Sequence, residues 1–303
     1  MKPIRYKIDV PATTANLGPG FDCLGLALDW WNTIVVEPAD KLCVTLRGLT
    51  EGIPADASNM TIENMQLFFD RIGKPMPPLR VTMTNRIPIG RGLGSSAAAL
   101  VGGLVAGNAL AGEPLSRFEL LELANASEGH PDNVSAALFG GFTVSVFEGA
   151  RVTSASVEPP PAWRAVLFIH DHALSTKFAR RILPKKVSRA DAVYNIGRAS
   201  LLTFAFLTAN AELLGVGTQD RLHQPYREPL VEGMRALLDA ARQAGAGGAA
   251  LSGAGPSLLA LARSPAIAAR VRDALTETAR EIRVRGDVEI VKLSAQGVRV
   301  TRL

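Results

Sequence analysis

The sequence is short of cysteine, aromatic residues and long apolar runs, and each shortage excludes a class of protein. Two cysteines in 303 residues cannot build a disulfide framework, and no Cys/His spacing indicates a zinc site. Aromatic residues make up 6% of the chain, which is few for a surface that stacks nucleic-acid bases. No apolar run approaches the ~20 residues that span a bilayer. We therefore expect neither a membrane protein nor a nucleic-acid-binding module.

The charge of the chain agrees with this expectation. The net charge is +5, but the 33 Lys and Arg residues are scattered, whereas a nucleic-acid surface needs them clustered. A mild positive field suits a nucleoside triphosphate equally well. Residues 1–10 are charged and lack the apolar centre of a signal peptide, so we expect a cytoplasmic protein. Cys23 and Cys43 are then expected to be reduced, in or near the core.

The most distinctive segment of the chain is a glycine loop at residues 88–99. In it three glycines alternate with single residues, and two serines follow. A strand is predicted at 79–86 before it and a buried helix at 95–110 after it. Such a loop can present backbone N–H groups to a phosphate, and glycine avoids the Cβ atom that would block the approach. Ser95 and Ser96 are candidates for capping the helix, and one hydroxyl for reaching Mg²⁺.

The glycine loop matches neither of the two common phosphate-binding patterns. It lacks the Gly-Lys-Ser/Thr ending of the P-loop and the spacing of the dinucleotide fingerprint. A glycine turn that only lets a helix pack closely on a sheet is therefore the alternative interpretation of this stretch.

Three other segments have the composition of binding loops. Residues 11–22 are predicted to form a loop that interrupts a sheet, and its Asn16 and Asp22 either bind a ligand or stabilise the turn. Residues 128–133 crowd polar groups before an apolar segment, where they are either site residues or helix caps. Residues 253–257 form a second glycine loop directly after a predicted strand.

The pattern predicts two domains, residues 1–158 and 159–303. The proline run 158–161 is the best candidate linker, because prolines stiffen the chain and stop strand pairing. After it we expect a strand at 164–170 and a long apolar helix at 189–214.

Taken together, three loops resemble the three motifs of the GHMP small-molecule kinases, in order and spacing: residues 11–22, 88–98 and 252–257. Further segments are similar to the homoserine kinases within that family: residues 128–133, 140–141, 175–184 and 223–227. The resemblance implies an α+β fold of two domains. The N-terminal domain would resemble the second domain of ribosomal protein S5, and the C-terminal domain would be a ferredoxin-like α/β sandwich.

The resemblance also implies the ligands. They are ATP, Mg²⁺ and L-homoserine, whose side-chain hydroxyl would be phosphorylated to O-phospho-L-homoserine in threonine biosynthesis. ATP would lie on the glycine loop, with the loop at 252–257 closing against it. The nucleotide-binding residues implied in this way are Asn59, Pro88, Ile89, Gly90, Arg91, Gly92, Leu93, Gly94, Ser95, Ser96, Ala97, Ala98, Gly253 and Gly255.

The implied amino-acid site combines carboxylates, arginines and an amide. Carboxylates suit the ammonium group, and two guanidinium forks suit the α-carboxylate. Asn133 would hold the hydroxyl in line with the γ-phosphoryl, since phosphoryl transfer depends mostly on positioning. Asp132 is the carboxylate to nominate if a general base is needed. The residues implied to contact the amino acid are Asn16, Asp22, His130, Asp132, Thr176, Arg180 and Arg227.

The implied magnesium ligands are Ser96 and a glutamate on the helix before residues 130–133. The sequence departs from the family here, because Ala126 stands where homoserine kinases often have glutamate. Glu128 is preferred because it is nearer to the turn, and Glu122 is the alternative. Water could also complete the magnesium shell without a glutamate.

Two other functions remain compatible with the motifs. One is a GHMP kinase for another hydroxyl substrate such as mevalonate, and the other is a non-catalytic sensor on the same fold. The paired arginines and aspartates favour an amino acid, and the intact glycines and serines of the loop favour catalysis. The pattern is compatible with a homodimer without indicating one.

Overall fold

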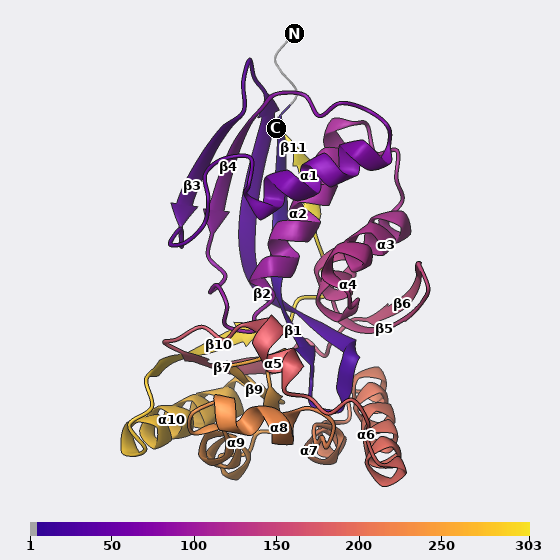
Figure 1. The fold of residues 1–303 in the computed structure, drawn as a ribbon. Coiled ribbons are helices and arrows are strands. Elements are labelled where there is room, and N and C mark those ends of the chain that lie inside the picture. The colour runs from indigo at the N-terminus through magenta and orange to yellow at the C-terminus, as the bar shows by residue number, and fades with distance from the viewer. Residues whose placement is uncertain (1–4) are drawn as a thin grey trace.

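The computed structural model describes residues 5–303 and contains two sheets, one above the other in Figure 1. The strands of the first sheet are β1 (Tyr6–Asn16), β2 (Gly20–Pro38), β3 (Cys43–Gly48), β4 (Leu79–Asn85), β5 (Phe142–Glu148), β6 (Arg151–Val157) and β11 (Arg299–Arg302). Their order is β11-β1-β2-β4-β3, and β5 pairs with both β2 and β6. All neighbours are antiparallel except β3 and β4.

Four helices cover one face of this sheet (Figure 1): α1 (Met60–Arg71), α2 (Ser95–Leu110), α3 (Arg117–Glu128) and α4 (Asp132–Phe139). Helices α2 and α4 lie directly on β1 and β2, while α1 packs on α2. Local capping fixes two of the helix starts. The Asn59 side chain accepts a hydrogen bond from the Thr61 amide, and Ser116 and Glu119 form a capping box.

The second sheet has four antiparallel strands in the order β10-β7-β9-β8. They are β7 (Arg164–His170), β8 (Gly248–Leu251), β9 (Leu258–Ala262) and β10 (Gly286–Lys292). Its helices are α5 (Thr176–Arg181), α6 (Arg189–Thr208), α7 (Leu214–Gly217), α8 (Gln224–Arg227), α9 (Met234–Gln243) and α10 (Pro265–Glu281).

The strands β7, β8 and β9 of the second sheet are buried on both faces. Successive residues of a strand point to opposite faces, so Val166 and Phe168 pack with the apolar side chains of α9 and α10. Ala165 and Leu167 instead join the core that lies under the first sheet. The two halves therefore share an apolar interface and hold each other in place.

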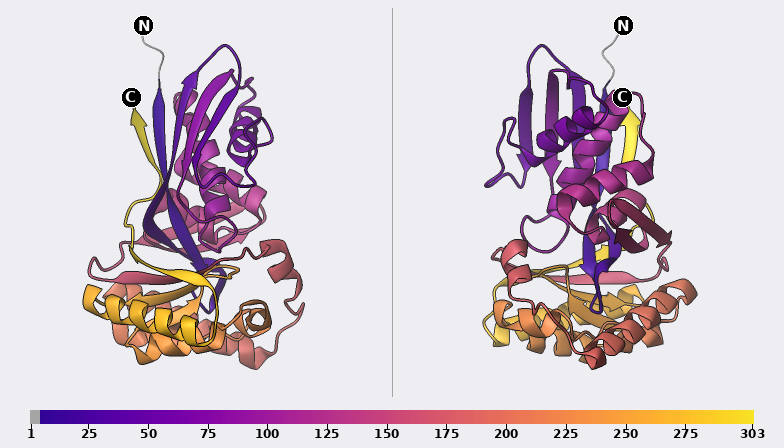
Figure 2. Two further views of the ribbon diagram at one scale, coloured as in Figure 1. Left: turned by 90° about the vertical axis from the view of Figure 1, so that its left-hand side faces the viewer. Right: turned by 45° about the vertical axis from the view of Figure 1, so that its right-hand side comes forward.

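The hairpin of β1 and β2 extends out of the first sheet into the second half (Figure 2). The expectation of a loop at residues 11–22 is wrong, because strand pairing continues past two register shifts and only residues 17–19 turn. Gly18 has a φ of 88° and faces the Thr218 carbonyl so closely that a Cβ atom would collide. Glycine therefore lets the turn of this hairpin dock on the second half.

Three further expectations need correction. Helix α6 ends at Thr208, before the expected residue 214, because Ala209 takes a left-handed conformation with a φ of 54°. Gly94 occupies the N-cap of α2, and no side chain among residues 5–303 caps that helix, so the serines that follow are not its caps. Cys23 is half-buried as expected, but Cys43 is exposed.

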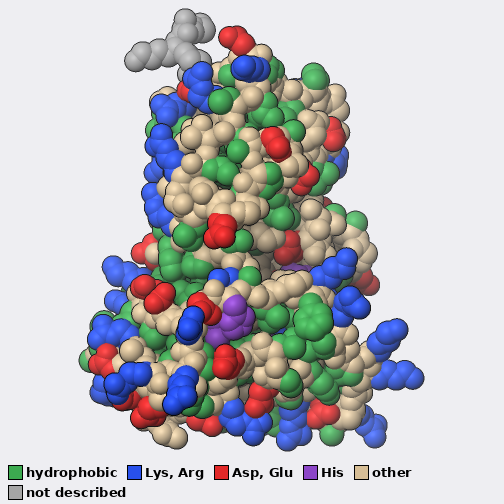
Figure 3. Space-filling view, turned by 60° about the vertical axis from the view of Figure 1, so that its left-hand side comes forward, with side chains coloured by type: hydrophobic (Ala, Val, Ile, Leu, Met, Phe, Trp, Pro, Cys, Tyr) green, Lys and Arg blue, Asp and Glu red, His purple; other side chains and the backbone are tan. Residues whose placement is uncertain are grey.

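The proline run lies between the two sheets, since β6 ends at Val157 and β7 begins at Arg164. Strand β11 lies after the domain boundary predicted at residue 158, yet it belongs to the first sheet. Strand β11 returns to the first sheet and pairs with residues 6–9 of β1, so the two ends of the described chain lie side by side. Figure 3 shows that the half built on the first sheet, at the top, is narrower than the half below it. Within residues 5–303, no helix is long and apolar enough to cross a bilayer.

Candidate active site

The glycine loop joins β4 to α2 in the conformation that its glycines permit. Gly90, Gly92 and Gly94 have φ values of 66°, 74° and 70°, a region that side chains with a Cβ atom rarely adopt. The loop ends at the first turn of α2, where free N–H groups and the helix dipole favour an anion. The strand, loop and helix predicted from the sequence are confirmed.

The three glycine-containing motifs meet at one hydroxyl group. Ser252 Oγ lies 2.7 Å from the Gly92 carbonyl oxygen and 2.8 Å from Thr14 Oγ1. The Gly253 amide also donates to the Ala15 carbonyl. A Cβ atom on Gly92 would collide with the Ser252 carbonyl. Glycine at position 92 therefore serves both the loop conformation and the close packing of the third motif.

The loop borders a polar cavity of about 90 Å³ at the junction of the two halves. Sixteen of the residues implied by the resemblance line it, together with Ala254. They are Asn16, Gly90, Arg91, Gly92, Gly94, Ser95, Ser96, Ala97, Glu128, His130, Asp132, Asn133, Thr176, Arg180, Arg227 and Gly253. Residues from strands, loops and helices up to 237 positions apart thus share one site.

Some of the expected residues lie elsewhere. The side chains of Leu93 and Ala98 are buried in the core, and Gly255 does not line the polar cavity. Pro88 and Ile89 line a further cavity beside the loop, and Ile89 also lines a more apolar cavity next to Ser95 and Ser96. Only part of the glycine loop therefore borders the polar cavity.

Asp22 and Arg180 form a bidentate ion pair at the edge of the cavity. Arg180 Nη1 donates to Asp22 Oδ2 at 2.7 Å, and Nη2 donates to Oδ1 at 2.8 Å. The hydrogen bond to Asp22 is the main cause that raises the pKa of Arg180. The resemblance implied one role for each residue, and the structure adds a direct contact between them.

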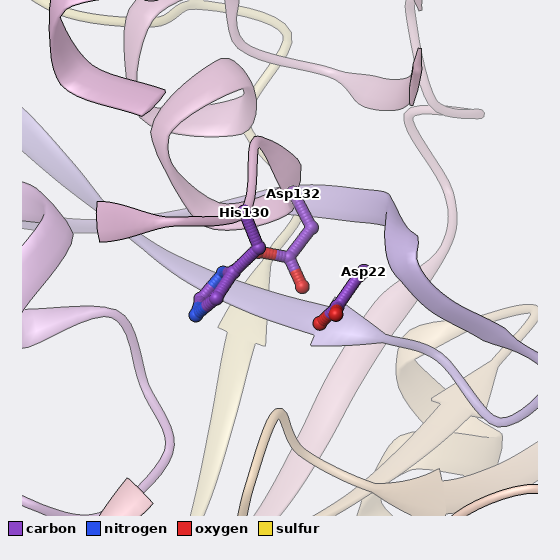
Figure 4. A group of neighbouring side chains, drawn as sticks. All are labelled: Asp22, His130 and Asp132. Atoms are coloured by element: carbon purple, nitrogen blue, oxygen red, sulfur yellow. The ribbon is translucent and has the colours of Figure 1, made fainter. Parts of the chain in front are cut away.

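Asp132 accepts several hydrogen bonds at the start of α4. Its Oδ1 lies 2.8 Å from His130 Nδ1 and 2.7 Å from the Asn133 amide nitrogen. The side chains of Asp22, His130 and Asp132 point toward one another (Figure 4), with one polar atom of each within 4.8 Å of the others. Two carboxylates facing one position suit a ligand that carries positively charged N–H donors.

The charges of this cluster shift the pKa of His130 upward. Burial is the largest single influence and lowers the pKa, but Asp132, Glu128 and Asp22 together outweigh it. Arg227 is 1% exposed, and burial, followed by the charge of Arg180, lowers its pKa to about 10. Arg227 therefore stays cationic near neutral pH.

Asn133 is held by a residue that the sequence did not single out. Thr13 Oγ1 donates to Asn133 Oδ1 at 2.8 Å. A hydroxyl donor identifies Oδ1 as the acceptor, which directs the Nδ2 amide toward Asp132 Oδ1 at 3.3 Å. Thr13 lies in the first motif but 120 residues from its partner, so no local pattern could reveal the contact.

The structure distinguishes the two glutamates considered for a metal. Glu128 Oε2 lies 3.4 Å from Ser96 Oγ, and both residues line the polar cavity. Glu122 does not line this cavity. Burial is the main cause that raises the pKa of Glu128. A partly buried carboxylate beside a hydroxyl is an all-oxygen donor set of the kind that Mg²⁺ prefers.

A second cavity of about 360 Å³ lies on the other side of the loop and shares Gly90, Ser95 and Ser96 with the first. Its wall is more apolar and includes Ile53, Met60 and Met83. Asn59 also lines this cavity, but its amide is already bonded to the Pro54 carbonyl and the Thr61 amide. Asn59 therefore shapes the cavity wall and the start of α1.

Comparison with known proteins identifies the class of this fold and site. The family model described as the GHMP kinases N terminal domain matches residues 59–141, and the GHMP kinases C terminal model matches residues 205–281. The chain belongs to the GHMP kinase family and has its two-domain α+β fold.

Similar proteins within the family are homoserine kinases. The chain is 48% identical to the homoserine kinase of Desulfitobacterium hafniense over 85% of this chain and 87% of the relative. It is 42% identical to the homoserine kinase of a Synechococcus strain over 98% of both chains. The crystal structure of homoserine kinase from Cytophaga hutchinsonii superimposes with a TM-score of 0.88 at 31% identity, covering 98% of this chain and 97% of that one.

Proposed function

We propose that this protein transfers the γ-phosphoryl group of ATP to the side-chain hydroxyl of L-homoserine, in threonine biosynthesis. The observation that carries the proposal is the polar cavity, where the glycine loop and the charged residues typical of an amino-acid site face each other. The homoserine kinases that resemble the chain over almost its full length support the choice of substrate.

ATP occupies both cavities in this proposal. The phosphates lie against the N–H groups of the glycine loop and the start of α2, where anions are favoured. The adenine base lies in the second cavity, whose apolar wall suits a planar ring. The shared residues Gly90, Ser95 and Ser96 connect the two positions.

Homoserine lies in the polar cavity with its two charged groups on different walls. Its ammonium group faces Asp22 and Asp132, whose carboxylates converge. Its carboxylate faces Arg227, and Arg180, which is paired with Asp22, adds positive charge beside it. The zwitterion is thus matched by both signs of charge, which a substrate without an ammonium group, such as mevalonate, cannot exploit.

Asn133 aligns the hydroxyl in this proposal. Its Nδ2 is fixed by Thr13 and Asp132, so the amide needs no reorganisation when the hydroxyl and the phosphoryl group approach. Because an amide does not take up a proton at neutral pH, Asn133 contributes alignment alone, and no general base is required.

Ser96 and Glu128 would hold Mg²⁺, whose charge would offset that of the phosphates during transfer. We expect Glu128→Gln to raise the Mg²⁺ concentration needed for half-maximal activity strongly, because an amide oxygen is a much poorer ligand than a carboxylate. Glu122→Gln is the matched control and is expected to leave the Mg²⁺ requirement unchanged. Mg²⁺ titrations of the two variants check this, and the reverse pattern would assign the ligand to Glu122.

The proposed contacts to the substrate carboxylate are tested by replacing each arginine with lysine, which keeps the positive charge but removes the forked guanidinium group. Arg180→Lys and Arg227→Lys are each expected to raise KM for homoserine far more than KM for ATP. Arg235→Lys is the control, since Arg235 pairs with Glu228 on the exposed surface. Steady-state kinetics with each substrate varied separates the effects. Equal increases in both KM values would assign the arginines to the nucleotide or the fold.

The proposed function as a whole is tested by an ADP-release assay with homoserine, serine, mevalonate and galactose. We expect homoserine to give the highest kcat/KM. Serine has one methylene group fewer, so its hydroxyl falls short of the aligned position. A higher kcat/KM for mevalonate would replace the proposed substrate, and release of ADP with none of them would favour a sensor over a kinase.

A further inference from the structure

His223 lies behind the amino-acid site and has no role in the proposal so far. Its side chain is fully buried, and it directly precedes the short helix α8 that carries Arg227. Its ring contacts two residues that belong to different halves of the molecule. Nε2 lies 2.7 Å from the carbonyl oxygen of Gly18, and Nδ1 lies 3.1 Å from Nη1 of Arg227.

The two contacts determine the protonation state of the ring. An arginine nitrogen can only donate a hydrogen bond, so Nδ1 must accept from Arg227. A carbonyl oxygen can only accept, so Nε2 must carry the proton that it donates to Gly18. His223 is therefore a neutral imidazole with its proton on Nε2. Burial, the largest influence, lowers its pKa and agrees with this state.

Other charged groups around the ring do not change this assignment. Asp220 Oδ2 lies 3.6 Å from Nε2, but Asp220 is already the acceptor for four N–H groups. They belong to the amides of Leu222, His223 and Gln224 and to the side chain of Asn195. Asp220 thus caps the start of α8 and does not draw a second proton onto the ring.

The donors of Arg227 show what His223 controls. One Nη1 proton goes to His223 and the other to the Gly253 carbonyl, while Nε–H donates to the Ala179 carbonyl. A guanidinium has five N–H donors, so the two on Nη2 remain, and they have no protein acceptor among residues 5–303. Since Arg227 lines the polar cavity, Nη2 is the part of the fork that is available to a carboxylate.

The contact of His223 Nε2 with the Gly18 carbonyl connects the ring to the hairpin residues on the other side of the site. Gly18 is in the turn of the β1–β2 hairpin, which carries Asn16 before the turn and Asp22 after it. Asn16 Oδ1 accepts from the Asp22 amide, and its Nδ2 donates to the Gly253 carbonyl that also binds Arg227. One imidazole therefore connects the residues proposed for the carboxylate with those proposed for the ammonium group.

We propose that His223 is a positioning residue for the kinase reaction, which holds the free Nη2 of Arg227 at a fixed place relative to Asn16 and Asp22. The role of Arg227 toward the substrate carboxylate rests on the proposed function above. His223 itself touches no substrate in this proposal. It acts by fixing the distance between Arg227 and the hairpin residues Asn16 and Asp22.

Two variants separate the two contacts of the ring. The oxygen of asparagine can occupy the place of Nδ1, so His223→Asn keeps an acceptor for Arg227 but does not reach Gly18. The amide nitrogen of glutamine can occupy the place of Nε2, so His223→Gln keeps the donor to Gly18 but leaves Arg227 without its acceptor. We expect His223→Gln to raise KM for homoserine roughly tenfold and KM for ATP by less than about twofold. His223→Asn keeps the contact with Arg227 but loses the one with Gly18, so it should also raise KM for homoserine, though by less than His223→Gln.

His170 provides the matched control for stability. It is also buried in the second half, and its Nε2 meets the Glu232 carbonyl at 2.9 Å. His170→Gln is expected to lower Tm about as much as His223→Gln without a rise in KM for homoserine. An imidazole ¹H–¹⁵N correlation spectrum of the wild-type protein should show His223 neutral with its proton on Nε2, and His223→Gln assigns the signal.

The outcomes distinguish this inference from the proposed function. The inference is overturned if folded His223→Gln binds homoserine like the wild type, if both KM values rise together, or if the ring is protonated on Nδ1. If Arg227→Lys weakens homoserine binding and His223→Gln does not, the proposed function stands and only the role of His223 fails. If the wild type does not phosphorylate homoserine, the proposed function fails, while the spectrum still decides the state of the ring.

Discussion

Asn133→Ala is expected to lower kcat with homoserine by about 10²-fold, with only a modest change in KM for homoserine. The amide sits at the start of α4, where Thr13 and Asp132 fix its orientation before the substrate arrives. Alignment of the hydroxyl matters most in the transition state, so its loss affects turnover more than binding. Steady-state kinetics and a single-turnover measurement at saturating homoserine check the prediction.

Thr13→Val is a milder variant that tests the same alignment of Asn133. Valine has nearly the shape of threonine and removes only the donor to Asn133 Oδ1, so kcat should fall in the same direction but by less. Thr13 is fully buried and touches no substrate in the proposed arrangement. An unchanged single-turnover rate in Asn133→Ala, with a large rise in KM, would show that Asn133 binds the substrate instead of aligning it.

The fold could be predicted where its signals are local. The start of α3 follows from Ser116 and Glu119, which form their capping box within four residues. The strand, glycine loop and helix at residues 79–110 also follow from adjacent residues. The loop expected at residues 11–22 was wrong because its glycines and prolines were treated as breakers, while pairing of β1 with β2 keeps most of it extended. Strand β11 reaches β1 from almost 300 residues away, and no local pattern predicts such a contact.

Prediction of the site from the sequence was limited in the same way, to groups that a motif names. Its polar residues were implied by a family resemblance that lists residue types in order, and the structure brings most of them to one cavity. Their partners were missed, because Thr13 lies 120 residues from Asn133 and Gly18 lies 205 residues from His223. A sequence motif identifies the groups that face a ligand more readily than the groups that hold them, since the latter depend on tertiary contacts.

Asp132→Asn is expected to raise KM for homoserine strongly while leaving substantial turnover at saturating homoserine. The carboxylate is proposed as a partner of the ammonium group, and the change replaces a charged contact with a neutral one. It also removes the main cause that raises the pKa of His130, so this pKa should fall and the ring should lose its proton as pH rises through a lower value. An NMR titration of His130 in both proteins checks the direction of the shift.

Asp22→Asn is the matched variant, because Asp22 faces the same position and already forms an ion pair with Arg180. If both aspartates bind the ammonium group, the two variants should share one kinetic pattern, a higher KM with turnover largely kept. A general base behaves differently, since its loss lowers turnover by ~10²–10⁴-fold even when substrate is saturating. Single-turnover measurements decide between these patterns. If Asp132→Asn binds homoserine normally and barely transfers phosphate while Asp22→Asn does not share this defect, Asp132 is the base and the mechanism proposed here is wrong.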